Sequence, residues 1–401
     1  MTQAAVDDPL AFSPYAYDLH DDPYPVYARL RAEAPLYRNE ELDFWALSRH
    51  EDVLGAFRNV DAYSNSYGVS LDPSAFTPDA HKFMSFLALD PPRHTRMRSL
   101  VGKGFTPTKV AVMEERVRAI ATDHLDAALS GDSFDFIGSF AGKVPMDVIS
   151  DLVGVPASDR DEVRHLADTV LHREDGVYDV PPAGLEAALK LAEYYQAMID
   201  ERRRRRRDDL TSALLEAEID GDRLTDEEVV GVLFLMVVAG NETTTKLLGN
   251  AWYWAWRHPD ERAKPLSDPT RIPDWVEETL RFDTSTQMLL RVTRAPVEYY
   301  GRSVPAGDRV LLLVGSANRD PAVFSDPDRY DLDRDTSRLV SFGSGRHFCM
   351  GAPLARLESR VCLEELVKRV ADYDIDAASA QRVHSVNVRG FASLPTSVRI
   401  R

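Results

Sequence analysis

The segment Phe342–Gly351, which reads FGSGRHFCMG, places one cysteine among three glycines. Glycine allows unusual backbone dihedral angles and a close approach of the backbone to a flat ligand. Leu354, Leu357 and Val361 follow at helical spacing, so Cys349 stands just before a predicted helix N-terminus. Free N–H groups and the helix dipole there lower a thiol pKa and favour a thiolate. An isolated Cys-x-Gly would instead suggest a buried free cysteine in a turn.

Composition limits the classes of protein that this chain can represent. The 401 residues include only two cysteines, too few for a disulfide framework and without zinc spacing. Cys362 lies inside the helical pattern and is interpreted as an inert core thiol. The net charge of −17 disfavours binding to nucleic acid or anionic membrane. The N-terminus has no basic and apolar signal pattern, so we expect a cytoplasmic protein without a membrane anchor.

Hydrophobic periodicity predicts a mainly α fold with small β-sheets (α+β). Residues 35–48 alternate as a β-hairpin, and most of residues 50–265 reads as helix. Residues 291–314 form a second β-rich stretch, and residues 383–400 read as short closing strands. We expect one large domain, residues 1–401, because the candidate site residues are spread along most of the chain.

One long helix is predicted over residues 225–257. Thr225 and Glu228 form a capping box at its start, and the apolar run 229–239 is too short to span a bilayer. The run ends in Ala239-Gly240-Asn241-Glu242-Thr243. By itself this segment is compatible with close helix packing at the small pair and a solvated Glu242.

The ten-residue cysteine segment resembles the haem-ligand loop of the cytochrome P-450 superfamily at every defining position, and the resemblance extends over essentially the whole chain. It implies the cytochrome P-450 fold, with haem b (iron-protoporphyrin IX) bound through Cys349 as the axial iron ligand. It also implies that Phe342 packs beside the sulfur, and that Gly343 and Gly351 belong to the cofactor-binding loop.

The long helix resembles the distal, oxygen-binding helix of the same family. This implies that Ala239 and Gly240 leave room for dioxygen beside the haem. It further implies that Thr243 hydrogen-bonds the bound oxygen and that Glu242 relays protons from solvent. Glu278 and Arg281, at an i, i+3 spacing, match the family's Glu-x-x-Arg, and Arg329 matches its downstream arginine. These three residues are expected to form a buried structural triad.

The resemblance also assigns the haem propionates and the substrate pocket. His94 and Arg98, four residues apart, are expected to bind the propionates together with Arg291 and His347. The apolar pocket for the substrate is expected to be lined by Phe86, Leu87, Val238, Met288, Leu289, Leu290 and Phe391.

The implied reaction is the hydroxylation or epoxidation of a small hydrophobic substrate, of lipid, terpenoid, steroid or polyketide type, with O2. The chain has no flavin or dinucleotide fingerprint, so the two electrons are expected from NAD(P)H through a separate ferredoxin and ferredoxin reductase. We expect a monomer. Two alternatives are a peroxygenase of the same fold, driven by hydrogen peroxide, and a non-catalytic haem protein that senses a ligand. Glu242 and Thr243 argue against both.

Two clusters of arginine residues are candidate binding surfaces. The run Arg202–Arg207 ends a predicted helix and is read as a solvated helix end, with nucleic-acid binding as the minor alternative. Arg346, Arg356 and Arg360 cluster around Cys349 on an otherwise acidic chain. They are a candidate docking patch for an acidic electron donor, with a solvated helix face as the alternative.

Overall fold

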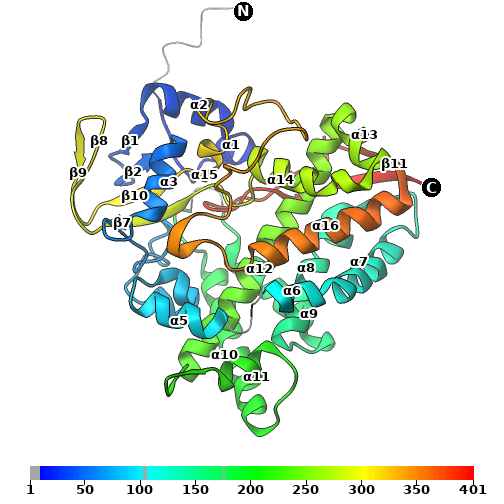
Figure 1. Cartoon of the computed structure of the whole chain (residues 1–401), viewed down its shortest axis with the longest axis horizontal. Coiled ribbons are helices and arrows are strands. Elements are labelled where there is room, and N and C mark those ends of the chain that lie inside the picture. The colour runs from blue at the N-terminus through cyan, green and yellow to red at the C-terminus, as the bar shows by residue number, and fades with distance from the viewer. Residues whose placement is uncertain (1–9, 103–104, 106, 175–176) are drawn as a thin grey trace, which may run out of the picture.

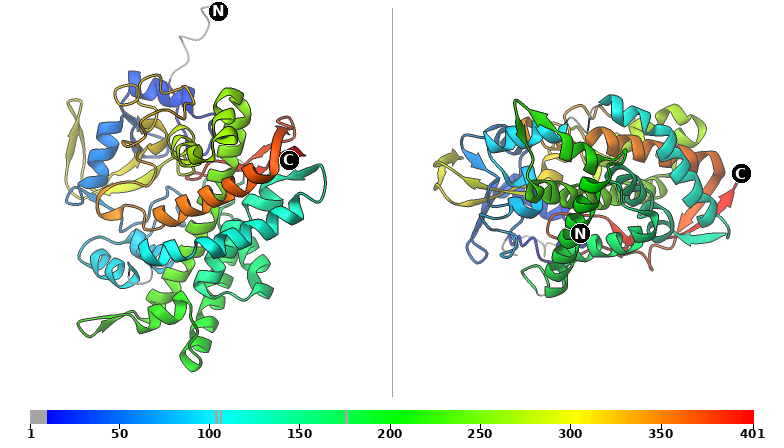
Figure 2. Two further views of the ribbon diagram at one scale, coloured as in Figure 1. Left: turned by 45° about the vertical axis from the view of Figure 1, so that its right-hand side comes forward. Right: turned by 90° about the horizontal axis from the view of Figure 1, so that it is seen from below.

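The computed structural model describes residues 10–102, 105, 107–174 and 177–401. Helices dominate it, and the strands of the largest sheet lie on one side of the molecule, whereas β11 and the C-terminal strand lie on the other (Figures 1 and 2). The predicted class, mainly helical with small sheets, is confirmed. The α-helices are α1 Tyr17–Asp21, α2 Tyr24–Glu33, α3 His50–Arg58, α4 His81–Met84, α5 Arg93–Gly102, α6 Pro107–Val112, α7 Glu114–Ala128, α8 Val144–Val153, α9 Arg160–Leu171, α10 Pro182–Arg204, α11 Leu210–Glu216, α12 Asp226–Arg257, α13 Pro259–Ser267, α14 Ile272–Phe282, α15 Val314–Ala317 and α16 Ala352–Arg369.

The largest sheet has the strand order β1-β2-β10-β7-β3, formed by Leu36–Asn39, Phe44–Leu47, Arg309–Leu312, Leu289–Thr293 and Tyr63–Ser64. The predicted hairpin over residues 35–48 is its β1–β2 edge. Strands β2 and β10 pair in parallel, and the other pairs in this sheet are antiparallel.

Both faces of this sheet are covered, which explains why all four residues of β2 are buried. Trp45 and Leu47 point into one apolar cluster, whereas Phe44 and Ala46 point into another. Successive side chains of a strand alternate between the two faces, so a sheet with two cores needs apolar residues at every position.

The remaining strands form small sheets at the periphery. A three-stranded sheet joins β11, β14 and β4, and three separate hairpins complete the set. The predicted closing strands over residues 383–400 correspond to β13 and β14. The strands are β4 Ser133–Asp135, β5 Glu218–Ile219, β6 Asp222–Arg223, β8 Val297–Tyr299, β9 Arg302–Val304, β11 Val370–Ile375, β12 Gln381–Arg382, β13 Phe391–Ser393 and β14 Pro395–Ile400.

Helix α12 runs through the centre of the molecule and packs against α4, α8, α10, α14 and α16. Its start is fixed by the predicted capping box, in which Thr225 and Glu228 satisfy each other's backbone N–H groups. It is the one described helix long and apolar enough to cross a membrane, but 61% of its apolar window is buried inside the protein. Its hydrophobic character is therefore accounted for by its place in the core.

The arginine run at the end of α10 is largely neutralised by acidic neighbours. Arg202 is fully buried and pairs with Asp209, while its guanidinium also donates to the Gly154 carbonyl at 2.7 Å. Arg203, Arg206 and Arg207 pair with Asp226, Glu216 and Glu201, respectively. These contacts attach the end of α10 to neighbouring segments. Arg202, Arg203, Arg206 and Arg207 are therefore paired within the chain and are not free to bind an external polyanion.

Candidate functional site

The cysteine segment is a loop that closes on itself before α16. The Cys349 N–H donates to the Phe342 carbonyl at 2.9 Å. Gly343 and Gly345 have φ values of 68° and 69°, in the left-handed region that side-chain-bearing residues rarely adopt. A Cβ atom on Gly345 would also lie 3.1 Å from the Phe57 carbonyl oxygen. These two glycines are thus required for the backbone path that presents Cys349.

The Cys349 thiol lies open to an internal cavity, but protein atoms surround it on its other sides. The N–H groups of Gly351 and Ala352 donate hydrogen bonds to its sulfur, as expected for a residue before a helix. Burial outweighs them and raises the pKa of the thiol above its ordinary value. The expected lowering of this pKa is therefore wrong for the free thiol, and thiolate formation needs a cation such as a metal ion at the sulfur.

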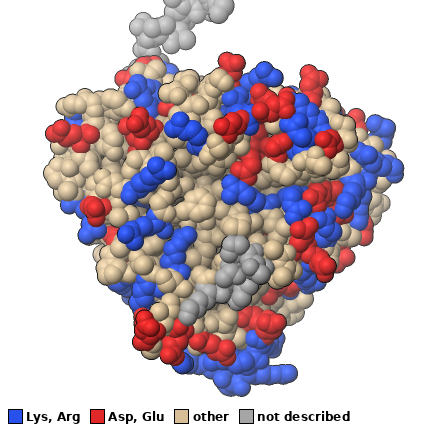
Figure 3. All heavy atoms as spheres, in the orientation of Figure 1, with Lys and Arg blue, Asp and Glu red and all other residues tan. Residues whose placement is uncertain are grey.

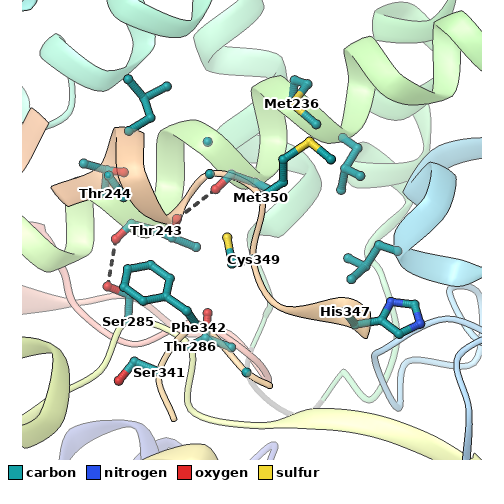
Figure 4. Close-up of a pocket in the computed structure, with 18 of the residues that line it drawn as sticks. Met236, Thr243, Thr244, Ser285, Thr286, Ser341, Phe342, His347, Cys349 and Met350 are labelled. Atoms are coloured by element: carbon teal, nitrogen blue, oxygen red, sulfur yellow. Dashed lines mark hydrogen bonds between the residues drawn. The ribbon is translucent and has the colours of Figure 1, made fainter. Parts of the chain in front are cut away.

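The cavity lies between α12 and the cysteine loop and, with its mouth, holds about 1410 Å³ of empty space. Figure 4 shows Cys349 facing it from the loop, with Thr243 and Thr244 on α12 at the other side. On α12 the residues that line it form one helical stripe. The stripe consists of Leu235, Met236, Ala239, Gly240, Thr243, Thr244 and Leu247.

Arg98, Arg291 and His347 line one part of the cavity, and a fourth titratable side chain, His94, lies against His347. The His94 and His347 rings lie 4.1 Å apart between centroids, and neither nitrogen of His94 has a hydrogen-bond partner. The Arg291 guanidinium is buried, and its one described side-chain hydrogen bond goes to the neighbouring Leu290 carbonyl. Within the described residues, none of the four forms an ion pair.

Burial outweighs the one described carboxylate that acts on this cluster, Asp90, which favours the charged forms of Arg291 and His94. Burial lowers the pKa of Arg291 to about 10 and that of His94 to about 4. His347 is affected most, since burial and the nearby Arg291 lower its pKa to about 2. Both histidines are therefore neutral near pH 7, whereas a buried guanidinium such as that of Arg291 is stabilised by an anion beside it. A planar ligand that carries two carboxylates and a metal ion for Cys349 fits these residues, and haem is such a ligand.

Glu278 and Arg281 are paired as predicted, at the centre of a buried network behind the cysteine loop. The Arg281 guanidinium binds both carboxylate oxygens of Glu278 at 2.7 Å, and both side chains are essentially excluded from solvent. Arg281 also donates to the carbonyls of Asn318, Pro327 and Arg329. The pair therefore holds together α14 and the irregular segment that leads to the cysteine loop.

The prediction that the Arg329 side chain completes this triad is wrong. Its side chain is 64% exposed and lies 4.0 Å from Asp331. Arg334 takes the place instead, with Nε 3.5 Å from the Glu278 carboxylate and only 8% of the side chain exposed. Arg329 contributes its backbone carbonyl, which accepts a hydrogen bond from Arg281, while its side chain is exposed.

The polar residues of α12 divide between the cavity and its surroundings. Thr243 lines the cavity, and its hydroxyl donates to the Ala239 carbonyl at 2.8 Å. Thr244 also lines it and hydrogen-bonds the buried Glu358 of α16, whose pKa is raised well above its ordinary value by burial. Glu242 instead faces α9 and binds the Lys246 ammonium at 3.0 Å.

The small pair Ala239-Gly240 lines the cavity as expected, and Gly240 also faces α8. A Cβ atom there would lie 3.4 Å from the Ile149 side chain of α8. This is an ordinary van der Waals distance, so Gly240 lies next to α8 but the packing does not require a glycine there.

Only three of the seven predicted substrate-pocket residues line the cavity: Phe86, Leu87 and Leu289. Val238 lies off the lining stripe of α12 and packs in a neighbouring apolar cluster. Met288, Leu290 and Phe391 are core residues, because their side chains point into apolar clusters away from the cavity. Sequence reasoning missed Ile149, Leu235, Met236, Leu247 and Ser285, which do line it.

The proposed arginine patch around Cys349 is mostly neutralised within the chain. Arg356 binds both carboxylate oxygens of Glu277, at 2.5 and 2.9 Å. Arg360 pairs with Glu364 and Glu114, at 2.7 and 2.6 Å. Figure 3 shows basic and acidic side chains intermixed on this side of the molecule. Arg346 is exposed and, in the part of the chain that is described, has no ion-pair partner.

A thiol, an apolar cavity and a group of histidine and arginine side chains without ion pairs among the described residues together fit a haem-thiolate site. The family model for cytochrome P450 matches residues 272–381. A putative cytochrome P450 123 from Mycobacterium tuberculosis is 58% identical over the full length of both chains. The chain therefore belongs to the cytochrome P450 family of monooxygenases.

Two further comparisons agree in fold and extent. The chain is 39% identical to vitamin D(3) 25-hydroxylase of Pseudonocardia autotrophica, over 94% of each chain. The solved structure of cytochrome P450 CYP109Q5 from Chondromyces apiculatus superposes with a TM-score of 0.88 at 34% identity. That superposition covers 97% of this chain and 98% of the other.

Proposed function

We propose that this protein is a haem b monooxygenase that hydroxylates or epoxidises a small hydrophobic substrate. The observation that carries the proposal is that the Cys349 sulfur shares one cavity region with His94, Arg98, Arg291 and His347, none of which forms an ion pair within the described residues. Cys349 would bind the iron, and His94, Arg98, Arg291 and His347 would bind the two propionates. When bound, the haem supplies the activation of dioxygen, to which a thiolate ligand contributes electron density.

The residues of α12 would control protons beside the haem. Thr243 offers a hydroxyl to the cavity that can both donate and accept a hydrogen bond. Its present acceptor, the Ala239 carbonyl, leaves the oxygen lone pairs of Thr243 Oγ1 free to accept from a donor in the cavity. Glu242 would receive protons from the solvent side and pass them toward Thr243.

The substrate class follows from the lining of the cavity. Phe86, Leu87, Ile149, Leu235 and Leu289 are apolar, and the lining also includes hydroxyl groups, among them that of Ser285. Such a pocket favours a hydrophobic molecule with few polar groups, fixed in orientation by one or two hydrogen bonds. The related vitamin D(3) hydroxylase supports a secosteroid or steroid-like compound as the first substrate to test.

We propose that electrons come from NAD(P)H through a separate ferredoxin and its reductase. The cysteine loop approaches the surface at Arg346 and Phe348, both of which are exposed. Phe348 directly precedes Cys349, so an electron donor that docks at these two residues would lie close to the sulfur ligand in the chain. We also propose that the protein works as a cytoplasmic monomer that forms one domain.

The test begins with the purified holoprotein. Its reduced carbon monoxide complex should show the red-shifted absorption band of thiolate-bound haem, and vitamin D3 should shift the resting haem band. Addition of NADH, a ferredoxin and its reductase should then give substrate-dependent NADH consumption and a product one oxygen atom heavier. Product from hydrogen peroxide alone, but none from NADH, would favour a peroxygenase. Ligand binding without either reaction would favour a haem-based sensor.

A further inference from the structure

A second carboxylic acid, Asp168 on α9, lies against Glu242 on α12. The two carboxyl groups share a hydrogen bond, and the Asn241 amide also donates to Asp168, at 3.4 Å. On its other side, Glu242 binds Lys246 at 3.0 Å. The two helices therefore bring two carboxyl groups and one ammonium group together beside the cavity.

Charge balance favours a bound proton in this cluster. If both carboxyl groups were ionised, Lys246 would balance only one of the two negative charges. Arg164, the other cation near Asp168, is itself paired with Asp161 at 3.1 Å. Two carboxyl groups in hydrogen-bond contact cannot both ionise easily, so one of them keeps its proton. Burial and the adjacent Glu242 raise the pKa of Asp168 to about 7.

The two acids differ in their access to water. Asp168 has an exposed face, although protein atoms surround its carboxyl group, whereas only 11% of the Glu242 side chain is exposed. Neither residue lines the cavity, but Glu242 is followed directly by Thr243, which does. Asp168 is thus the more exposed of the two acids, and Glu242 is the one carried by the helix that lines the cavity.

We propose that Asp168 is the outer member of a two-carboxyl proton relay and supplies Glu242 with its proton. In the transfer, the O–H bond of Asp168 breaks and an O–H bond forms on a carboxylate oxygen of Glu242. The negative charge moves to Asp168, which then takes a proton from water. Lys246 keeps the pair close to neutral before and after the step. Asp168 acts through Glu242 and is a positioning residue; its role rests on the proposed monooxygenase function.

The first test measures the shared proton without turnover. Asp168 binds an extra proton in the folded state between its unfolded pKa, about 4, and its folded pKa. Stability from this group is therefore present at low pH and is lost as the pH rises toward 7. The melting temperature of the wild-type holoprotein, minus that of Asp168→Asn, should fall between about pH 5 and about pH 8. Asp168→Glu should behave like the wild type, and so should Glu162→Gln, an exposed acid on the same helix.

The second test measures the relay. With vitamin D3, NADH, a ferredoxin and its reductase, wild-type turnover should decline above about pH 7 as the pair loses its proton. Asp168→Asn should be severalfold slower below that pH and should lose the inflection, and Asp168→Glu should restore both. A pH-independent difference in melting temperature would overturn the shared proton. Unchanged turnover and pH profile in Asp168→Asn would overturn the relay. A wild type that consumes no NADH would instead count against the proposed function, and the melting curves would still decide whether the acids share a proton.

Discussion

The guanidinium group of Arg173 binds both carboxylate oxygens of Asp72, at 3.1 and 2.8 Å. Asp72 is fully buried, and only 11% of the Arg173 side chain is exposed. Two residues further along, Ser74 donates through its N–H and its hydroxyl to Asp179, at 2.8 and 2.7 Å. The segment before α4 is thereby tied to the segment between α9 and α10.

Loss of the Asp72 carboxylate should destabilise the protein clearly. Asp72→Asn leaves a mostly buried guanidinium without an ionic partner, which costs about 3–5 kcal/mol. The free energy of unfolding, measured by denaturant titration, should fall by an amount of this order. Ser74→Ala removes an exposed contact between the same two segments and should change it by less than about 1 kcal/mol. If the two variants lowered the free energy of unfolding equally, the Asp72–Arg173 ion pair would contribute no more to stability than the exposed Ser74 contact.

Replacement of the sulfur ligand should abolish monooxygenation. Cys349→Ser keeps the backbone hydrogen bond to Phe342 and the glycine geometry, so the loop should still form. Its reduced carbon monoxide complex should lack the red-shifted band. Cys362→Ala is the control, because that thiol is fully buried in the core, and it should keep the band. A normal band in Cys349→Ser would remove Cys349 as the iron ligand.

The Glu278 network predicts a graded series of arginine variants. Arg281→Ala leaves Glu278 buried without its bidentate partner and should cost about 3–5 kcal/mol, with little soluble holoprotein. Arg329→Ala removes an exposed side chain and should change stability by less than about 0.5 kcal/mol. Arg334→Ala should lie between them. Haem content and melting temperature, measured for all three variants, rank their effects on stability. A large effect of Arg329→Ala would contradict the predicted ranking.

Thr243 should control how efficiently NADH consumption leads to product. Thr243→Ala removes the hydroxyl that faces the cavity, so product per NADH should fall severalfold and hydrogen peroxide per NADH should rise. Thr243→Ser should stay close to the wild type. Thr244 is not a neutral control, since its hydroxyl hydrogen-bonds Glu358. Thr245→Val is a better one, because Thr245 is buried and donates to the Ala141 carbonyl away from the cavity. If Thr243→Ala formed as much product per NADH as the wild type, this role of Thr243 would be ruled out.

Binding of the electron donor should depend on Arg346 and on the salt concentration. Arg356 and Arg360 are already paired within the chain, which leaves Arg346 as the cysteine-loop cation available to an acidic partner. Arg346→Glu should raise the half-saturating ferredoxin concentration severalfold, and added salt should weaken the wild type, since charges are screened beyond about 8 Å. Arg204→Glu, an exposed arginine at the end of α10, is the matched control. Equal behaviour of both variants would argue against docking at the cysteine loop.

Local patterns predicted the main elements of the site well. The capping box fixed the start of α12, and the glycine spacing indicated the loop that presents Cys349, because both depend on residues within a few positions of each other. Contacts made between distant segments were harder. Nothing in the sequence near Arg329 shows that its side chain is exposed and that Arg334 lies beside Glu278 instead.

The substrate pocket shows where a simple periodicity argument would have helped. In β7, Leu289 and Arg291 face the cavity, and Leu290 between them faces the opposite core, as strand alternation requires. The prediction that adjacent residues all line one pocket was therefore inconsistent with a strand. Asp168 left no such signal, because its importance arises only when α9 packs against α12.

The lack of ion pairs at His94, Arg98, Arg291 and His347 within the described residues has a consequence for biosynthesis. Without two carboxylates from outside, the folded chain must hold these groups together at an energetic cost, and a ligand that binds only the folded state removes it. Bound haem would then stabilise the folded protein in addition to serving as its cofactor. The yield of folded protein in a cell should follow the supply of haem, and chains made faster than haem is supplied should be degraded rather than stored as empty enzyme.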